Sequence, residues 1–364
     1  MSGDRSHRYA VILAGGHGKR LWPLSTDRKA KQFRGVGDTK PMLVQTYERL
    51  AACVPAGNIF ISTTAAQAQD VRAVIPQIDP DHLIVEPRAA GKPAAFLLAA
   101  HRIHELDPEA IVLSSASDTL LSPLQAFQRD SDRAFAFVQD NPEWLALFGS
   151  TPDRADTSLG YVRANGSAMD ADGVLVARGF YEKPDQDAAD EYAGSGEYFW
   201  NSSHYFFATS ALIEAYQRNA PQWAEAVRSY ATHDEGADYP ETGGPSHEVT
   251  PFVDGSVPIG VVPVEFTWHD MGTWPAVHRA LAESDSAVMA VSGAAMVDLD
   301  SRDTLVVNES PMTIITGQLE GLAIIVTNSV VLVAPLDDLG DESDLLSRLR
   351  HEYEIQTPPD DEGN

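Results

Sequence analysis

The feature that most constrains the fold is a short apolar run that ends in a cluster of glycines near the N-terminus. Residues 9–14 read YAVILA, and Gly15, Gly16 and Gly18 follow at once. An apolar run of this length is typical of a buried strand, and glycines directly after it indicate a loop at the end of that strand. The sequence therefore predicts a first strand that enters a glycine loop, an arrangement shared by several nucleotide-binding folds.

Strand and helix patterns then alternate over the first 150 residues. The expected strands are residues 59–62, 83–85 and 111–113, and the expected helices are residues 41–53, 65–75, 93–106 and 123–138. This alternation favours a parallel, doubly wound α/β sheet. Less regular strands follow at 160–164, 178–181, 203–208 and 260–266, with helices near 210–219 and 274–282. We interpret this second stretch as an α/β insertion that completes a substrate cleft.

The pattern changes again near residue 287. Closely spaced apolar runs, AVMAV, TLVVN, MTIIT, LAIIVT and VVLVA, are separated by turn residues and predict a small all-β part. The last residues are strongly acidic and end in PPDDEGN. We therefore expect a main domain over 1–285, a β-rich C-terminal domain over 286–340, and an acidic, partly disordered tail over 341–364.

Composition excludes several classes of function. The chain has 26 Lys and Arg against 53 Asp and Glu, a net charge of −27, and such a field repels nucleic acid. No apolar run approaches the roughly 18 residues that cross a bilayer, and no apolar signal segment precedes the first strand, so we expect a cytoplasmic protein without membrane partners. The single cysteine, Cys53, forms neither an internal disulfide nor a thiolate metal cluster by itself.

One segment runs against this acidic background. Residues 19–34 hold six cations and one acid, Asp27, a local net charge of +5. A charge cluster of this kind is by itself compatible with a solvated loop. Its position directly after the glycines favours a phosphate-binding role instead.

The spacing of the glycines separates the nucleotide-binding loops from one another. A dinucleotide-binding fingerprint requires a third glycine where Leu21 stands, and a P-loop requires a hydroxyl residue where Arg20 stands. The sequence therefore disfavours both a dinucleotide-binding loop and a P-loop. What remains is a glycine loop whose backbone N–H groups approach phosphate oxygens while Arg20 and Lys31 neutralise their charge.

The segment AGGHGKRLWPLSTDRKAKQF, residues 14–33, resembles the signature of sugar-1-phosphate nucleotidyltransferases, and its Trp22 and Lys31-Gln32-Phe33 resemble most the mannose-1-phosphate guanylyltransferases, or GDP-mannose pyrophosphorylases. Six further motifs match the same family in order and spacing: Glu86-Pro87, Ser117-Asp118-Thr119, Gly160-Tyr161, Glu182-Lys183-Pro184, Trp200-Asn201-Ser202 and residues 268–274, WHDMGTW. Taken singly, Asp118 fits a turn and Asp270 fits a helix cap. The joint order of the motifs favours the family.

The resemblance implies a fold and a reaction. The fold is α/β, with a Rossmann-like doubly wound, mostly parallel sheet of the GT-A-like nucleotidyltransferase kind and a small C-terminal β-rich domain. The reaction is attack of a sugar 1-phosphate, in the first place mannose 1-phosphate, on the α-phosphorus of GTP, which gives GDP-mannose and pyrophosphate. A phosphate monoester is already ionised, so catalysis depends on positioning and on neutralising charge rather than on a general base.

The resemblance also assigns residues to roles. Asp118 and Asp270 would hold Mg²⁺ through carboxylate oxygens. The catalytic set is Arg20, Lys31, Asp118, Lys183 and Asp270. The nucleotide-binding set is Ala14, Gly15, Gly16, Gly18, Lys19, Arg20, Glu86 and Lys92. The sugar-binding set is Gly160, Glu182, Asn201 and Glu248.

Alternatives stay open where the chain departs from the family pattern. The departures are Lys19, Ala30, Ala90-Gly91, Ser117, Thr119 and Ser203. They leave room for another nucleoside triphosphate, another hexose or a cyclitol phosphate, or for a non-catalytic relative that binds nucleotide or sugar phosphate. The retention of both Asp118 and Asp270 favours an enzyme, because binding alone does not require two magnesium carboxylates. By analogy with related C-terminal extensions, we expect a homodimer.

Overall fold

The computed structural model describes residues 5–16, 18–26, 30–36, 40–164, 173–233, 238–240, 244–245, 250, 257–281, 288–291, 296–340 and 344–356. The chain forms two compact units, each assembled from separate stretches of sequence. Unit 1 consists of Met1–Gly16, Thr46–Ser117 and Leu121–Trp268, and unit 2 of His17–Gln45, Asp118–Leu120 and His269–Asn364.

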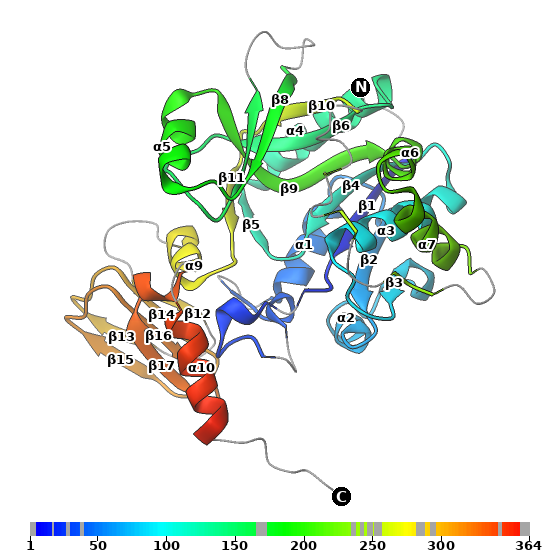
Figure 1. The fold of residues 1–364 in the computed structure, drawn as a ribbon. Coiled ribbons are helices and arrows are strands. Elements are labelled where there is room, and N and C mark those ends of the chain that lie inside the picture. Colours follow the sequence, from blue (N-terminus) through cyan, green and yellow to red (C-terminus); the bar gives the residue numbers. More distant parts are fainter. Residues whose placement is uncertain are drawn as a thin grey trace, which may run out of the picture. The chain divides into compact units, whose positions relative to one another are not determined.

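Unit 1 is built on a nine-stranded sheet (Figure 1). Its strands in spatial order are β3 (Leu83–Glu86), β2 (Ile59–Thr64), β1 (Arg8–Leu13), β4 (Ile111–Ala116), β9 (Tyr198–Ala208), β6 (Leu145–Ser150), β10 (Ile259–Pro263), β8 (Leu175–Glu182) and β7 (Gly160–Ala164). The first four pair in parallel, as the alternating pattern predicts. β9 then pairs antiparallel with both β4 and β6, so the sheet is mixed.

Helices cover both faces of this sheet, and β9 shows why. Tyr205 and Phe207 pack against Phe96 of α3 (Lys92–Leu106), with ring centroids 5.8 and 4.8 Å apart. Phe206 points the other way and lies 5.1 Å from Phe135 of α4 (Leu124–Asp140). Successive side chains of a strand point to opposite faces, so an apolar strand needs a helix on each side. The predicted α/β, doubly wound class is confirmed.

The other helices described before residue 257 are α1 (Met42–Leu50), α2 (Ala68–Val74), α5 (Gln186–Ser195), α6 (Thr209–Asn219) and α7 (Pro221–Ala231). Short 3-10 turns lie at η1 (Lys19–Leu21), η2 (Lys31–Phe33), η3 (Ala56–Asn58) and η4 (Pro80–His82). β5 (Thr119–Ser122) and β11 (Thr267–Asp270) form a separate two-stranded sheet. No helix among the described residues is long and apolar enough to span a membrane.

Unit 2 contains the predicted β-rich part as two small sheets. One consists of β12 (Val288–Val291), β14 (Thr304–Asn308), β16 (Leu322–Val326) and β17 (Val331–Pro335), and the other of β13 (Met296–Leu299) and β15 (Ile314–Gly317). From β12 to β16 the chain alternates between the two sheets, and the strands that become neighbours pair in parallel. The short, regularly spaced apolar runs of the sequence thus form successive turns of a coil.

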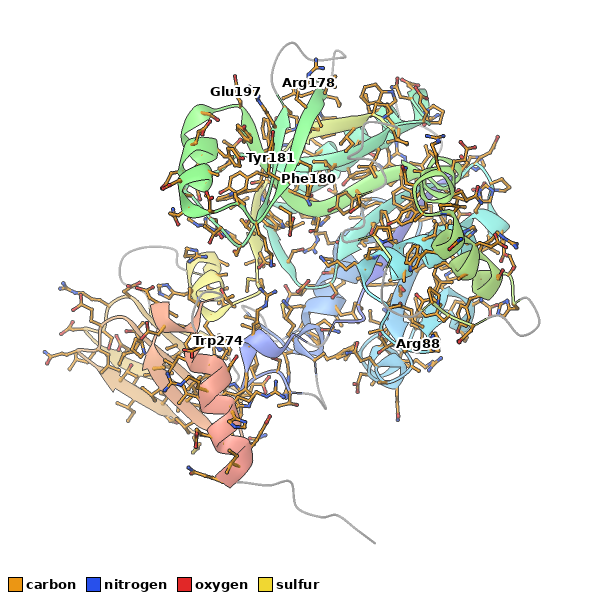
Figure 2. The ribbon with its side chains drawn as sticks, viewed as in Figure 1. Arg88, Arg178, Phe180, Tyr181, Glu197 and Trp274 are labelled. Atoms are coloured by element: carbon orange, nitrogen blue, oxygen red, sulfur yellow. The ribbon has the colours of Figure 1, made fainter. Side chains whose placement is uncertain are left out.

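The β-rich part shares one hydrophobic core with the glycine-loop segment. Leu21 and Trp22 pack in the same cluster as Leu305 and Ile325 and as Trp274, the first residue of α9 (Trp274–Leu281), labelled in Figure 2. The compact units therefore divide the chain differently from the sequence-predicted boundary at 285/286, because the apolar residues after the glycines bury themselves against C-terminal strands. The expectation that residues 1–285 fold as a domain of their own stays a prediction.

The acidic tail contains a helix that the sequence pattern does not predict. α10 (Leu345–Gln356) follows the 3-10 turn η5 (Asp337–Leu339). Leu346 is buried in the unit 2 core, and Leu349 and Tyr353 pack against it. Apolar side chains three and four positions apart share one helix face, and this face holds the acidic helix in place.

Candidate active site

Four of the five predicted catalytic residues, Arg20, Lys31, Asp118 and Asp270, belong to unit 2, whereas Lys183 belongs to unit 1. Asp118 immediately precedes β5, Asp270 ends β11, and these two strands pair with each other. The ammonium group of Lys31, at the start of η2, forms an ion pair with the Asp118 carboxylate. Lys31 itself is only 7% exposed. Two carboxylates far apart in the sequence thus meet a buried lysine.

The charge environment of Asp270 identifies its neighbours. Asp270 retains some exposed surface, yet protein atoms surround its carboxyl group closely enough for burial to raise its pKa. The negative charge of Asp118 adds to this rise, whereas Lys31 and Arg20 lower the pKa. The charges of the other three predicted catalytic residues of unit 2 therefore all act on Asp270.

Gly272 leaves the space in which the Asp270 side chain sits. Its backbone N–H donates to Oδ2 of Asp270 over 3.1 Å. A Cβ at position 272 would lie 2.4 Å from that oxygen and 3.3 Å from Nη2 of Arg20. At the start of α9, the N–H of Ala276 donates to the Thr273 hydroxyl over 3.3 Å. A Cβ at this position would therefore force the carboxylate to shift and would crowd the guanidinium.

Gly18 plays the same part for Lys31. Its φ is +63°, in the left-handed region that favours glycine. A Cβ there would approach Cγ of Lys31 to 2.5 Å. The Ser25 hydroxyl donates to the Gly18 carbonyl over 2.5 Å and fixes this turn. Arg20 is exposed, and nothing is described of the side chain of its neighbour Lys19.

In unit 1 the predicted nucleotide-binding residues Ala14, Gly15 and Gly16 follow β1. The N–H of Ala14 donates to Ser62 over 2.8 Å, and its carbonyl accepts from the Thr63 hydroxyl over 3.1 Å. The carbonyl of Gly16 accepts from Gln67 over 3.2 Å. These bonds hold the loop against the end of β2.

Glu86 lies beside this loop, as the Glu-Pro motif predicts. A Cβ on Gly15 would lie 3.5 Å from Oε1 of Glu86. Burial raises the pKa of Glu86 to about 7, and the Tyr239 hydroxyl, which donates to Oε2 over 2.7 Å, opposes the rise. The sequence reasoning missed Tyr239, because no motif surrounds it. Lys92, also predicted here, is the exposed first residue of α3.

Three of the four predicted sugar-binding residues meet in unit 1. Gly160 begins β7 and pairs in register with Glu182 at the end of β8. A Cβ on Gly160 would lie 2.7 Å from Oε2 of Glu182, 3.4 Å from Phe180 and 3.6 Å from Cβ of Asn201. Phe180 is labelled on β8 in Figure 2. The fourth residue, Glu248, lies outside the described residues and stays a prediction.

Hydrogen bonds fix the side chain of Asn201 and the backbone of Lys183. Asn201 is 9% exposed, and its amide donates to the Tyr205 hydroxyl over 2.7 Å while its Oδ1 accepts from the N–H of Ser203 over 3.1 Å. Lys183 is exposed, with a φ of +47°. Its N–H donates to Leu159 over 3.2 Å, which anchors the lysine one residue after Glu182.

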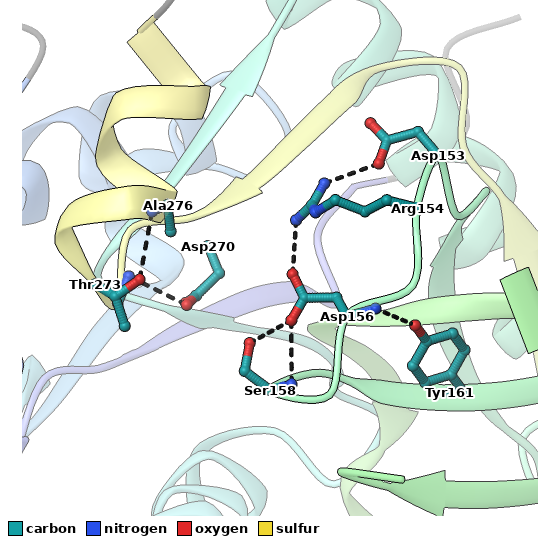
Figure 3. Close-up of polar contacts among 9 residues, drawn as sticks. Asp153, Arg154, Asp156, Ser158, Tyr161, Asp270, Thr273 and Ala276 are labelled. Carbon is teal, nitrogen blue, oxygen red and sulfur yellow. Dashed lines mark hydrogen bonds and ion pairs between the residues drawn. The ribbon is translucent and has the colours of Figure 1, made fainter. Parts of the chain in front are cut away.

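A further polar network, also missed by the sequence reasoning, orders the loop before Gly160. Asp156 accepts from Arg154 over 2.8 Å and from the Ser158 hydroxyl over 2.5 Å, and its N–H donates to the Tyr161 hydroxyl over 2.9 Å (Figure 3). Burial raises the pKa of Asp156, but the hydrogen bonds from Ser158 and Arg154 outweigh it and keep the pKa below its usual value. Arg154 also lies 4.7 Å from the ring centroid of Trp200, the first residue of the Trp-Asn-Ser motif.

With this geometry in view, comparison with known proteins identifies the class. Residues 9–286 match the family described as nucleotidyl transferase, and the chain belongs to that family. It is an enzyme of nucleotidyl transfer, and the predicted recognition is confirmed at this level.

Individual relatives extend the match over most of the chain. The xanthan biosynthesis protein XanB of Xanthomonas campestris pv. campestris (strain B100) is 27% identical over 93% of this chain and 73% of its own length. A mannose-1-phosphate guanylyltransferase of Salmonella muenchen is likewise 27% identical, over 93% of this chain and 73% of the relative. A crystal structure described as mannose-1-phosphate geranyltransferase from Thermus thermophilus superposes with a TM-score of 0.81 at 26% identity, covering 94% of this chain and 99% of that one.

Proposed function

We propose that the protein transfers a guanylyl group from GTP to mannose 1-phosphate, giving GDP-mannose and pyrophosphate. The observation that carries the proposal is the meeting of Asp118 and Asp270 with Lys31 and Arg20 in unit 2. Two anions react here, so the site has to neutralise charge on both and on the departing pyrophosphate. A mixed cluster of carboxylates and cations suits that task.

The carboxylates fit Mg²⁺. Among the described residues, no three His, Cys, Asp or Glu side chains gather to hold a metal by themselves. Two carboxylates are enough for Mg²⁺, which prefers oxygen ligands and completes its coordination with phosphate oxygens and water. Asp118 and Asp270 would hold the ion, and the ion would supply positive charge to the phosphates. The small gap kept open by Gly272 preserves the orientation of one of these ligands.

The residues of the chain do the positioning. Lys31 and Arg20 attract the triphosphate through their positive charge. The buried ion pair with Asp118 holds the Lys31 ammonium group in one position. The phosphate oxygen of the sugar phosphate attacks the α-phosphorus, and the bond from that phosphorus to the β-phosphate oxygen breaks. The phosphate is ionised at neutral pH, so no side chain has to accept a proton.

Glu86 supports guanine as the base. Guanine carries two neighbouring N–H donors on its pairing edge, and the lone pairs of a single carboxylate oxygen accept from such donors, whereas adenine and cytosine place an acceptor beside their amino group. One oxygen of Glu86 is bound to Tyr239 and the other lies toward the Gly15 loop. On the sugar side, Glu182 and Asn201 offer the acceptors and donors that hexose hydroxyls require.

The test is turnover by the purified full-length protein. Pyrophosphate release is measured with Mg²⁺, each of the four nucleoside triphosphates, and mannose, glucose and inositol 1-phosphates. We expect the highest kcat/KM with GTP and mannose 1-phosphate. A higher value with another pair would transfer the proposal to that pair, and binding of GTP without turnover of any pair would contradict it in favour of a non-catalytic relative. The homodimer stays a prediction, which the mass of the protein in solution tests.

A further inference from the structure

The segment that carries Lys31 is bound to the β-rich C-terminal part by an ion pair. Nη1 of Arg34 donates to Oε2 of Glu309 over 2.6 Å, between residues 275 positions apart. The two side chains retain only 20% and 23% of their exposed surface. Solvent and salt screen an enclosed pair of this kind less than a pair on the open surface. Both residues belong to unit 2.

On one side of this pair, Arg34 closes the 3-10 turn that begins with Lys31. The N–H of Arg34 donates to the Lys31 carbonyl over 3.0 Å, and the Arg34 carbonyl accepts from the N–H of Met42, the first residue of α1, over 2.9 Å. A three-residue 3-10 turn has few hydrogen bonds of its own, so external anchors decide its orientation. The Arg34 side chain is such an anchor.

On the other side, Glu309 projects from a turn with a dense set of hydrogen bonds. Its N–H donates to Val326 of β16 over 2.8 Å. Its neighbours Asn308 and Ser310 are 3% and 4% exposed, and Oδ1 of Asn308 accepts from the N–H and hydroxyl of Ser310 over 2.9 and 2.7 Å. The nearby Met312 carbonyl accepts from the Asn308 amide over 2.7 Å. The Glu309 carboxylate therefore projects from a backbone that several hydrogen bonds hold in place.

We propose that Glu309 is a positioning residue for nucleotide binding: through Arg34 it fixes the turn at residues 31–33, so that the Lys31 ammonium stays directed at Asp118 and the triphosphate. The role of Lys31 in this statement rests on the proposed function. The β-rich part then contributes to the affinity for the nucleotide without touching it. The Lys31 side chain packs closely against Gly18, so the position of the turn decides where its ammonium group lies.

The test compares four proteins: wild type, Glu309→Gln, the charge exchange Arg34→Glu with Glu309→Arg, and the control Glu320→Gln, which alters an exposed glutamate of the same β-rich part. The first readout is the Kd of GTP by calorimetry with Mg²⁺, together with the KM values of GTP and mannose 1-phosphate. When two residues that contact each other are both changed, the combined effect differs from the sum of the two single effects. The difference corresponds to about a tenfold change in a dissociation constant. We therefore expect Glu309→Gln to raise the Kd and KM of GTP about tenfold, the KM of the sugar phosphate to stay constant, and the charge exchange to restore most of the loss.

The second readout needs no ligand. The N–H groups of Phe33 and Arg34 donate within the turn, to Ala30 over 3.1 Å and to Lys31 over 3.0 Å, so their hydrogen exchange reports its order. We expect faster exchange in Glu309→Gln, recovery in the charge exchange, and no change in the control. Unchanged exchange, or faster exchange with an unchanged Kd of GTP, would overturn the proposal. Faster exchange with weaker GTP binding, in a protein without turnover, would support the positioning role and contradict the proposed function.

Discussion

Tyr239 and Glu86, which lie 153 positions apart, form a buried hydrogen bond in which the tyrosine hydroxyl donates to Oε2 of the carboxyl group over 2.7 Å. The backbone of Tyr239 is in turn held by Arg88, whose guanidinium donates to the Tyr239 carbonyl. The Tyr230 ring packs against Tyr239 at 4.8 Å between centroids. One oxygen of the proposed base-reading carboxylate is thereby fixed, which orients the other.

The first prediction concerns this bond. Tyr239→Phe removes the donor and keeps the ring, so the pKa of Glu86 should rise further above about 7, because the hydroxyl at present stabilises the charged form. We expect the KM of GTP at pH 7.5 to rise by roughly three- to tenfold, and unfolding free energy to fall by about 1–3 kcal/mol because a buried acceptor loses its partner. Tyr230→Phe is the matched control. Equal KM values for wild type and Tyr239→Phe would show that the bond does not orient the carboxylate.

The second prediction is a pH dependence of stability. The folded-state pKa of Glu86, about 7, exceeds its usual value of 4.5, so between these values the folded protein binds a proton that the unfolded chain has released. Stability should therefore decrease as the pH rises through this window, by about 3 kcal/mol for this group. Glu86→Gln removes the contribution. In urea unfolding at pH 5 and pH 8, we expect the variant to gain stability relative to wild type at the higher pH, and a constant difference would contradict the assignment.

The third prediction tests the sugar pocket through Gly160. An alanine there would bring its Cβ to 2.7 Å from Oε2 of Glu182, so the carboxylate has to move. We expect Gly160→Ala to raise the KM of the sugar phosphate about tenfold, the effect of a lost charged hydrogen bond, with little change in the KM of GTP. Gly194→Ala in α5, where nothing lies within 4 Å of the added Cβ, is the control. Equal effects on both substrates would argue against a specific sugar contact.

The fourth prediction concerns Gly272. Gly272→Ala places a methyl group 2.4 Å from Oδ2 of Asp270 and should displace this carboxylate. We expect kcat to fall about a hundredfold, since small displacements of a catalytic group have effects of this order. Gly57→Ala, at a glycine with nothing within 4 Å, should leave kcat unchanged. A wild-type kcat in the Gly272→Ala variant would contradict the assignment of Asp270 to the reaction centre.

The fifth prediction concerns the metal. Asp118→Asn keeps the shape of the side chain but removes a charge that a divalent cation and Lys31 both require. Turnover by wild type should stop with EDTA and return with added Mg²⁺, and the variant should need a higher Mg²⁺ concentration and lose about a hundredfold or more in kcat. Measured pyrophosphate release against Mg²⁺ concentration checks both statements. Identical Mg²⁺ dependence in the two proteins would contradict the role of Asp118.

Much of the fold was readable because it depends on local patterns. The strand at 160–164 and the helices starting near 93 and 274 occur where the sequence predicts them, at β7, α3 and α9. Apolar spacing and turn residues specify such elements without distant partners. The direction of β9 was not readable in this way, since an apolar strand can pair with its neighbours in either sense.

The family motifs also predicted which residues meet, within limits. Gly160, Glu182 and Asn201 come together as expected, and so do Lys31 and Asp118. Motif order carries this information, because a shared family implies a shared topology. Residues outside motifs, such as Tyr239, carry no comparable signal in a single sequence.

By itself, then, the sequence determined the α/β class, the glycine loop and the identity of the charged groups, since these follow from apolar periodicity and residue chemistry close along the chain. Only the tertiary structure decided that Trp22 shares a core with C-terminal strands, that Arg34 pairs with Glu309, and that Tyr239 reaches Glu86. The physical reason is that burial and ion pairing depend on distances in space between residues hundreds of positions apart. The pattern of neighbours along the chain contains no measure of those distances.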